Sequence, residues 1–165
     1  MSPEVARLGH VALETPDLAE SLSFYVDTAG MELVERSDGT AYLRAVEEYD
    51  HHSLSLTEAD EPGVDHVGWQ TEEPEHVAAF AKRLEDRGLD VTRIDADAEA
   101  GQGEAIRFTV PNGHRFELYG EMAKPEPPRE RRSKLRNRQY DPTNNHPTAP
   151  NRIDHLQIWD GDALL

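Results

Sequence analysis

The chain has 165 residues, no cysteine and a formal net charge of −16 at pH 7. This length predicts one domain of about 100–150 residues with some additional chain. The absence of cysteine excludes a disulfide framework and a thiolate metal site, so any metal must be held by histidine, carboxylate or water. The chain shows neither a long apolar run nor a basic, apolar leader, which argues against a membrane span and a secretory signal.

The acidic residues are concentrated in the first 120 positions. Residues 1–120 hold 26 acidic and 9 basic side chains, whereas residues 121–165 hold 7 and 8. This charge disfavours nucleic-acid binding by the first part of the chain. Only three of the seventeen basic residues are lysine. An acidic, lysine-poor composition resembles that of cytoplasmic proteins from halophiles, and an ordinary acidic protein is the alternative.

The first predicted unit begins with a strand at 7–14. Within it, Val11 and Leu13 point to one face and His10 points to the other, because side chains alternate along a strand. A helix follows, and Gly30 is suited to end it. This helix is expected over residues 16–29. A hairpin of strands 31–36 and 40–46 and a further strand at 51–57 complete the unit.

The second predicted unit repeats this order after a connector at 59–63. A strand leads it, and Pro74 suits the first position of a helix that Gly88 ends. The two strand–helix–three-strand units predict an α+β domain over residues 1–120. The strands of the second unit are expected at 64–70, 90–95, 104–110 and 114–120.

Residues 121–150 differ in character from the two units. They are rich in proline, carry a basic run at 129–138 and show no apolar period, which predicts a linker or a strap along the surface. The alternative is that the basic run docks on an acidic neighbour. Residues 152–159 then read as the opening strand of a third unit, so residues 151–165 are predicted to be the first strand of a truncated second domain. A lone strand cannot bury its apolar face, which favours a homo-oligomer.

A histidine recurs in the leading strand of each unit. His10, His66 and His155 each stand in a short run that alternates apolar and polar residues. In the first two runs the apolar neighbours are expected to pack against the helix, so each histidine faces the opposite side of the sheet. Glu117 faces the same side of the last strand of the second unit.

Two equivalent units that curve together would bring His10, His66 and Glu117 onto one concave face. Two imidazoles and one carboxylate form a 2-His-1-carboxylate site, which leaves metal positions open for substrate and dioxygen. Ser55 occupies the position in the first unit that Glu117 holds in the second. The absence of a fourth carboxylate there favours an open site. The alternative for each histidine alone is ordinary exposure to solvent.

Further polar residues are predicted near this face or assigned elsewhere. Arg115, Tyr119, Glu14 and Gln70 share the predicted concave face, as ligand-orienting groups or as ordinary polar lining. His114 is placed in the turn before Glu117, with a supporting role as the alternative. The histidines assigned to the surface are His51, His52, His76 and His146.

Several segments resemble catechol 2,3-dioxygenase, an extradiol ring-cleaving family of the vicinal oxygen chelate superfamily. The most specific are the connector at 58–63 (Glu-Ala-Asp-Glu-Pro-Gly) and the segment 111–119 (Pro-Asn-Gly-His-Arg-Phe-Glu-Leu-Tyr). The resemblance keeps its order along nearly the whole chain. Its other parts are residues 8–13, the helix ending in Phe24-Tyr25, and residues 152–155 followed by Gly161-Asp162.

The resemblance implies a curved mixed sheet of paired βαβββ modules, at 7–58 and 64–120. It also implies a non-haem iron(II) centre, with manganese(II) as a possible substitute, which opens a catechol ring with dioxygen. Family members have two such domains, and the iron usually lies in the second. His155 matches the first iron ligand of that second domain. By equivalence of the modules, His10, His66 and Glu117 take the ligand positions of the first domain.

Three alternatives remain beside extradiol cleavage. A glyoxalase-like isomerase would use the same module but generally needs a fourth protein ligand, and Ser55 argues against it. A metal-free structural half of a longer enzyme is the second. A small-molecule-binding module, like the drug-sequestering members of the superfamily, is the third. Whether this chain is active by itself, and which base would serve the reaction, are left open.

Overall fold

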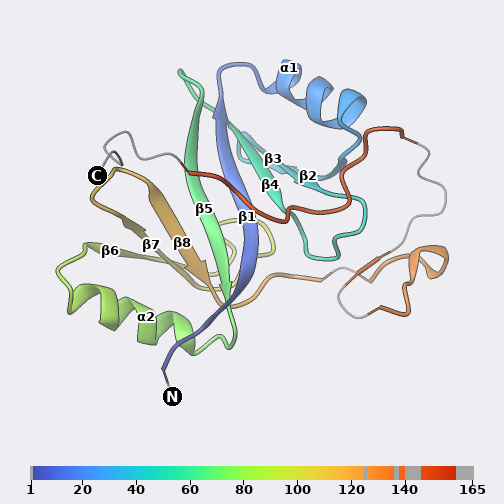
Figure 1. Ribbon diagram of the computed structural model, residues 1–165. Coiled ribbons are helices and arrows are strands. Elements are labelled where there is room, and N and C mark those ends of the chain that lie inside the picture. The colour runs from blue at the N-terminus through green and yellow to red at the C-terminus, as the bar shows by residue number, and fades with distance from the viewer. Residues whose placement is uncertain (1, 125, 136–137, 140–145, 159–165) are drawn as a thin grey trace.

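The computed structural model describes residues 2–124, 126–135, 138–139 and 146–158. Across this described part, eight strands form one curved sheet in the order β2-β3-β4-β1-β5-β8-β7-β6 (Figure 1). The first four in this order come from the first module and the last four from the second. The predicted α+β class with paired βαβββ modules in a curved mixed sheet is therefore confirmed.

The first module contains β1 (Val5–Thr15), β2 (Glu32–Ser37), β3 (Thr40–Arg44) and β4 (Leu54–Glu58). β1 pairs with β4 in parallel, while β2 pairs with β3, and β3 with β4, in antiparallel order. Strand β4 begins later than the predicted strand at 51–57, because residues 51–53 form a bend before it.

The second module repeats this pairing. It contains β5 (Gly63–Thr71), β6 (Val91–Ile94), β7 (Ala105–Thr109) and β8 (Arg115–Tyr119). β5 pairs with β8 in parallel, and β6, β7 and β8 follow in antiparallel order. The two modules meet where β1 and β5 pair in antiparallel order at the centre of the sheet. This junction places the leading strands, and with them His10 and His66, side by side.

The helix of the first module is shorter and wider than predicted. Helix α1 (Leu18–Leu22) continues as a π-helix over Ser23–Thr28, in which the Ala29 amide donates to the Phe24 carbonyl at 2.8 Å. Asp17 caps α1, since its side chain accepts from the Glu20 amide at 2.9 Å. The Thr15 hydroxyl lies 2.7 Å from that of Ser21.

Each helix covers its own half of the sheet. Leu22 and the predicted inward residue Val11 lie in one core cluster, and Leu13 packs against it. Helix α2 (His76–Glu85) contributes Val77 to a second cluster, which also contains Leu118. The apolar side chains of these two clusters therefore face the helices, and the opposite face of the sheet carries polar residues together with a small third cluster that includes Ala105 and Tyr119. No helix in the described part of the chain is long and apolar enough to cross a membrane.

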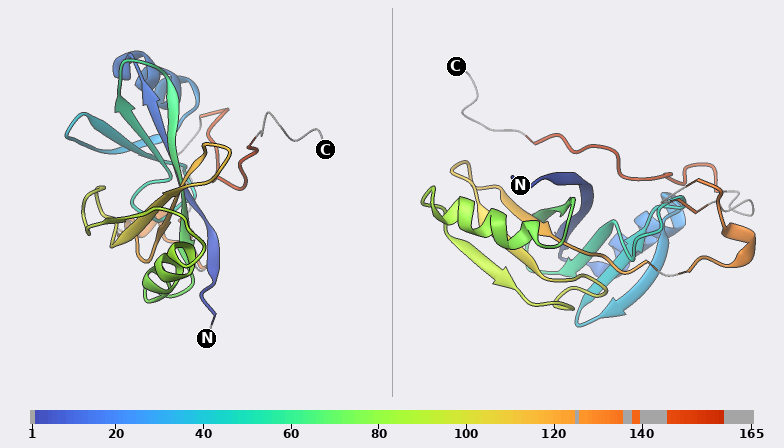
Figure 2. Two further views of the ribbon diagram at one scale, coloured as in Figure 1. Left: turned by 90° about the vertical axis from the view of Figure 1, so that its left-hand side faces the viewer. Right: turned by 90° about the horizontal axis from the view of Figure 1, so that it is seen from below.

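After a turn at residues 147–148, the chain continues to residue 158 as an extended segment that crosses the centre of the sheet (Figures 1 and 2). The strand predicted at 152–159 is not formed over its described residues 152–158. β1 and β5 already have partners on both edges, so this segment lies over the sheet and has no free edge to join. Ile153 packs against the first core cluster. The assignment of residues 151–165 to a second domain stays a prediction.

The basic run docks on acidic residues of the first module. Arg131, in a 3-10 turn at Arg129–Arg131, lies 3.3 Å from Glu32, and Arg138 forms an ion pair with Glu47. These contacts favour the docked alternative for this segment over a solvated linker. The boundaries of a linker at 121–150 remain a prediction.

Candidate metal centre

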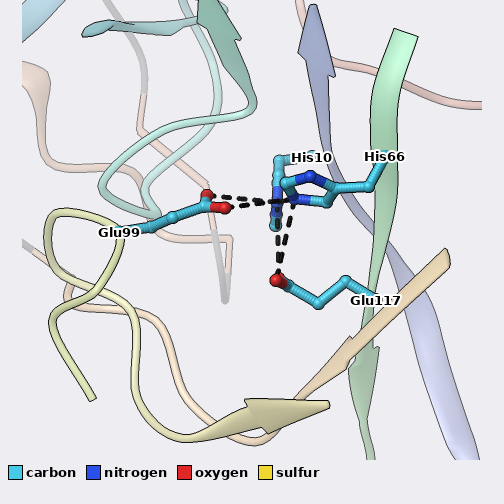
Figure 3. A group of neighbouring side chains, drawn as sticks. All are labelled: His10, His66, Glu99 and Glu117. Carbon is cyan, nitrogen blue, oxygen red and sulfur yellow. Dashed lines mark hydrogen bonds and ion pairs between the residues drawn. The ribbon is translucent and has the colours of Figure 1, made fainter. Parts of the chain in front are cut away.

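Three neighbouring strands bring His10, His66 and Glu117 together (Figure 3). The Nε2 atoms of His10 and His66 lie 3.1 Å apart. A carboxylate oxygen of Glu117 lies 3.6 Å from the His10 Nε2, and the other lies 3.7 Å from the His66 Nε2. All three residues are at most 1% exposed. The structure thus places the three predicted residues in one buried group on the face opposite the helices.

A fourth side chain, Glu99, completes the group from the loop between β6 and β7 (Figure 3). Its Oε1 lies 3.2 Å from the His66 Nε2 and its Oε2 lies 3.5 Å from the His10 Nε2. One donor atom from each of the four residues lies within 4.8 Å of all the others. The site therefore has a second carboxylate, in contrast to the expected open site, and it comes from a loop rather than from the position of Ser55.

Two glycines make room for this packing. A Cβ on Gly68 would overlap the His10 ring, and a Cβ on Gly9 would overlap the Tyr119 ring. Gly68 stands directly opposite His10 in the antiparallel pair. A glycine inside a strand often marks such a close approach.

The two histidines differ in protonation. Burial, reinforced by the charge of His52, holds the pKa of His10 well below its usual value. Burial acts in the same direction on His66, but hydrogen bonds to Asp65 and Glu99 and the charge of Glu117 outweigh it and raise the His66 pKa to about 9. His10 is therefore a neutral donor at pH 7, while His66 is positively charged unless a metal cation displaces its additional proton.

Asp65 fixes the orientation of the His66 ring. Its Oδ2 lies 2.7 Å from the His66 Nδ1, and its other oxygen pairs with Arg115. A carboxylate on the remote nitrogen of a histidine holds the ring and directs the other nitrogen to a metal. The predicted concave-face residue Arg115 thus acts on the group through Asp65.

The buried carboxylates have further partners. Gln102 donates to Glu117 at 2.7 Å, and the Arg107 Nε donates to its other oxygen at 2.6 Å. Burial raises the pKa of Glu117. Burial acts on Glu99 in the same direction, but interactions with His52 and His66 outweigh it and lower the Glu99 pKa. Arg107 also pairs with Glu99.

His52 belongs beside the group, so its assignment to the surface is wrong. It is 1% exposed, and its ring centroid lies 5.2 Å from that of His10 and 4.7 Å from that of Tyr42. Its Nδ1 lies 3.1 Å from the Nδ1 of His51, whose Nε2 lies 3.1 Å from Glu35. The bend at 51–53 has no alternating pattern, so the sequence offers no signal for this burial.

The other predicted residues lie near the group or away from it. Tyr119 is buried with its ring centroid 5.4 Å from that of His10. Gln70 accepts from the Arg7 Nε at 3.1 Å. The side chain of His155 is 86% exposed and lies 3.5 Å from Asp154, outside the group. The remaining candidates are half-buried: Glu14, His51, His76, His114 and His146.

The donor set suits a divalent transition metal. Imidazole and carboxylate are the ligands that iron, manganese and zinc accept in proteins. Among the described residues the buried Glu99 Oε2 accepts no hydrogen bond, although it points into the group and lies 3.5 Å from the His10 Nε2 and 3.7 Å from the His52 Nε2. A metal cation would satisfy that oxygen, so the residues fit a metal.

Residues 64–123 match a family model described as the catechol 2,3-dioxygenase-like N-terminal domain. The chain is 44% identical over 159 residues to the manganese-dependent 2,3-dihydroxybiphenyl 1,2-dioxygenase of Geobacillus genomosp. 3, covering 96% of this chain and 50% of that protein. It is 38% identical over 156 residues to a metapyrocatechase of Geobacillus stearothermophilus, covering 94% of this chain and 46% of that protein.

Solved structures of homoprotocatechuate 2,3-dioxygenase from Brevibacterium fuscum are similar as well. They superpose with a TM-score of 0.72 at 29% identity, over 76% of this chain and 35% of theirs. The chain spans about half the length of the curated relatives it matches.

Proposed function

The chain belongs to the extradiol ring-cleaving dioxygenases by sequence and fold, and from that premise we propose that it takes part in opening a catechol ring with dioxygen and a divalent metal. We propose it in the role of the N-terminal half of a two-domain enzyme. Support comes from the family model, which describes an N-terminal domain, and from the coverage of the relatives.

The observation that carries the proposal is the buried group of two histidines and two carboxylates. His10, His66, Glu99 and Glu117 would hold iron(II) or manganese(II), the latter being the metal named for one relative. When bound, such a metal supplies a positive charge that favours the deprotonated catechol. Asp65 would keep the His66 ring directed at the group, and Gln102 would fix Glu117.

The protonation of His10 and His66 determines how the group would bind a metal. The low pKa of His10 keeps its nitrogen free to bind metal, while the proton on His66 must leave before that nitrogen can do the same. Metal binding by this group therefore releases a proton at neutral pH.

A second candidate is a metal-free structural half of the enzyme. Arg107 pairs with both carboxylates, and protonated His66 adds another positive charge, so the two negative charges are balanced without a metal. Glu99, as a fourth donor, also meets the main requirement of a glyoxalase-like isomerase. The matched relatives are named as dioxygenases, which places that candidate below the other two.

We also propose self-association and a cytoplasmic location. Val64, Leu156 and Ile158 are large apolar side chains exposed on or beside the segment that crosses the sheet. A second copy of the chain or a further domain could bury these apolar side chains by packing on them. The acidic, lysine-poor composition supports the location. His155 would ligate metal only as part of a second domain.

The direct test is anaerobic calorimetry with iron(II) and with manganese(II) on the wild type and on His66→Ala. We expect one-to-one binding in the wild type and at least about a tenfold loss of affinity in the variant, because losing even a residue that supports a ligand typically costs about 10–100-fold. His155→Ala is the matched control and should bind as the wild type does, because His155 lies outside the group.

Catechol and air are then added while the yellow ring-cleavage product is followed. Metal binding with a yellow product would establish a working site in this chain. Binding without a product would assign the chain a metal-holding role that needs a further domain. Equal metal affinity in the wild type and in His66→Ala would refute the site.

A further inference from the structure

We propose that Arg107 is an internal counter-ion that competes with a divalent metal for Glu99 and Glu117, and so limits metal occupancy of the site. This inference rests on the proposed metal centre and adds a means by which the chain controls it.

Arg107 lies on β7, directly opposite Glu117 on β8. Its Nε donates to the Glu117 Oε2 at 2.6 Å, and its Nη2 donates to the Glu99 Oε1. The same Nη2 lies 3.5 Å from the His66 Nε2. One guanidinium group therefore contacts three of the four donor residues.

Arg107 and a metal would compete for the two carboxylate oxygens that face His66. The Glu117 Oε2 lies 3.7 Å from the His66 Nε2, and the Glu99 Oε1 lies 3.2 Å from it. Both accept from Arg107. The other two carboxylate oxygens face His10 at 3.6 Å and 3.5 Å. Arg107 thus lies on the His66 side of the group, and on the His10 side the Glu99 Oε2 accepts no hydrogen bond from the described residues.

A guanidinium group stays charged over the whole range in which proteins are stable, so raising the pH does not remove this competitor. A metal held by the four residues would lie within a few ångströms of it, where repulsion between like charges is strong. Metal binding therefore requires the Arg107 side chain to move. The side chain is 22% exposed, so it has a route toward solvent that the fully buried Glu117 lacks.

The first module shows no equivalent cation. Tyr42 on β3 stands opposite Ser55 on β4, in the register that Arg107 and Glu117 hold in the second module. The carboxylate and the cation thus occur together in one module and are both absent from the matching positions of the other. The Arg107–Glu117 pair is therefore specific to the site in the second module and does not follow from the repeated βαβββ fold.

The test is a titration with manganese(II) of the full chain, of Arg107→Gln and of Arg107→Lys. Bound metal is measured as loss of the free manganese(II) paramagnetic resonance signal, and by calorimetry. We expect Arg107→Gln to bind at least about tenfold more tightly than the wild type, because it removes a like charge next to the metal. Arg107→Lys keeps the charge and should remain within about threefold of the wild type.

Arg93→Gln is the matched control for the loss of one positive charge. Arg93 lies on β6, is 64% exposed and pairs with Glu85 at 2.9 Å, away from the site. Its affinity for manganese(II) should equal that of the wild type. An equal gain in Arg93→Gln and Arg107→Gln would overturn the proposal, because the effect would then be one of net charge alone.

The remaining outcomes separate this inference from the proposed function. If the wild type binds and Arg107→Gln binds no more tightly, the inference is wrong and the metal centre stands. If only Arg107→Gln binds, the inference holds and the wild-type metal centre fails. If no variant binds, both fail. An Arg107→Gln protein that folds only with manganese(II) supports the inference, and one that manganese(II) does not fold overturns it.

Discussion

The imidazoles of His10 and His66 carry one positive charge between them at neutral pH in the absence of metal. Their Nε2 atoms lie 3.1 Å apart, so a charge on both rings would be strongly unfavourable. The charge resides on His66, which has Asp65 and Glu99 as partners, while His10 has two neighbouring imidazoles and no close carboxylate hydrogen bond. This asymmetry makes the site sensitive to pH.

We expect the metal-free protein to lose stability between about pH 6.5 and pH 9. The folded-state pKa of His66, about 9, lies above its ordinary value of 6.5, so its stabilising contribution is complete below 6.5 and is lost as the pH rises through 9. The loss should be on the order of 1–3 kcal/mol. Urea unfolding with a chelator at pH 6, 7, 8 and 9 measures it.

His66→Gln should remove this slope, and His155→Gln, an exposed control, should keep it. An unchanged slope in His66→Gln would show that another group is responsible. Excess manganese(II) should reverse the trend, since a metal-bound histidine must be deprotonated and metal affinity then rises with pH.

The sequence predicts the site residues that lie on strands, but not those that lie in a loop or a bend. His10, His66 and Glu117 were found because each alternates with apolar neighbours along a strand, which fixes its face. Glu99 and His52 stand in a loop and a bend, where no period relates position to direction. Arg107 does lie on a strand, but the sequence does not disclose that β7 pairs with β8 in the register that sets it opposite Glu117.

At the level of elements, the centre of the sheet depends on strand glycines. Gly68 on β5 has no space for a side chain because the His10 ring of β1 lies against it. We expect Gly68→Ala to lower the free energy of unfolding by about 1–3 kcal/mol, the usual cost of overpacking a core, and to weaken metal binding by displacing His10. Urea unfolding and calorimetry measure the two effects.

Gly103→Ala is the control for this substitution. The atom nearest to its new Cβ would be the Glu121 Cβ at 3.3 Å, a contact that a small adjustment relieves. If Gly68→Ala proved as stable as Gly103→Ala, the close packing of β5 against His10 would not be a requirement of the fold.

The order of the elements followed from the sequence, but their detailed geometry did not. Alternation and turn residues located all the strands of both modules, with boundaries shifted by a few residues. The π-helical turn at Ser23–Thr28 has the same apolar spacing as an ordinary helix, so nothing in the sequence distinguishes it. Residues 152–158 alternate as a strand does, yet β1 and β5 offer them no free edge.

At the level of the whole molecule, the net charge of −16 sets a dependence on salt. Repulsion among acidic side chains opposes the compact state and is screened as ionic strength rises. We expect the free energy of unfolding to increase by on the order of 1 kcal/mol between 0.05 M and 0.5 M KCl, where the Debye length falls several-fold. Urea unfolding at constant pH is the measurement.

Sorbitol at matched osmolality is the control for non-electrostatic effects and should stabilise the protein less than KCl does. A free energy of unfolding that falls with KCl would show that attractive ion pairs, such as those of the basic run with Glu32 and Glu47, dominate the surface. In that case the resemblance to halophilic proteins would lose its physical basis.

The antiparallel pairing of β1 with β5 also has a consequence for the order of assembly. The hairpins within each module join residues close in sequence, whereas this seam joins residues such as Ala12 and His66 across most of a module. Contacts between distant residues pay more loop entropy and form late. The two histidines come together only when β1 pairs with β5. A metal at this position would therefore bind the fully folded protein and not chains in which only one module has folded.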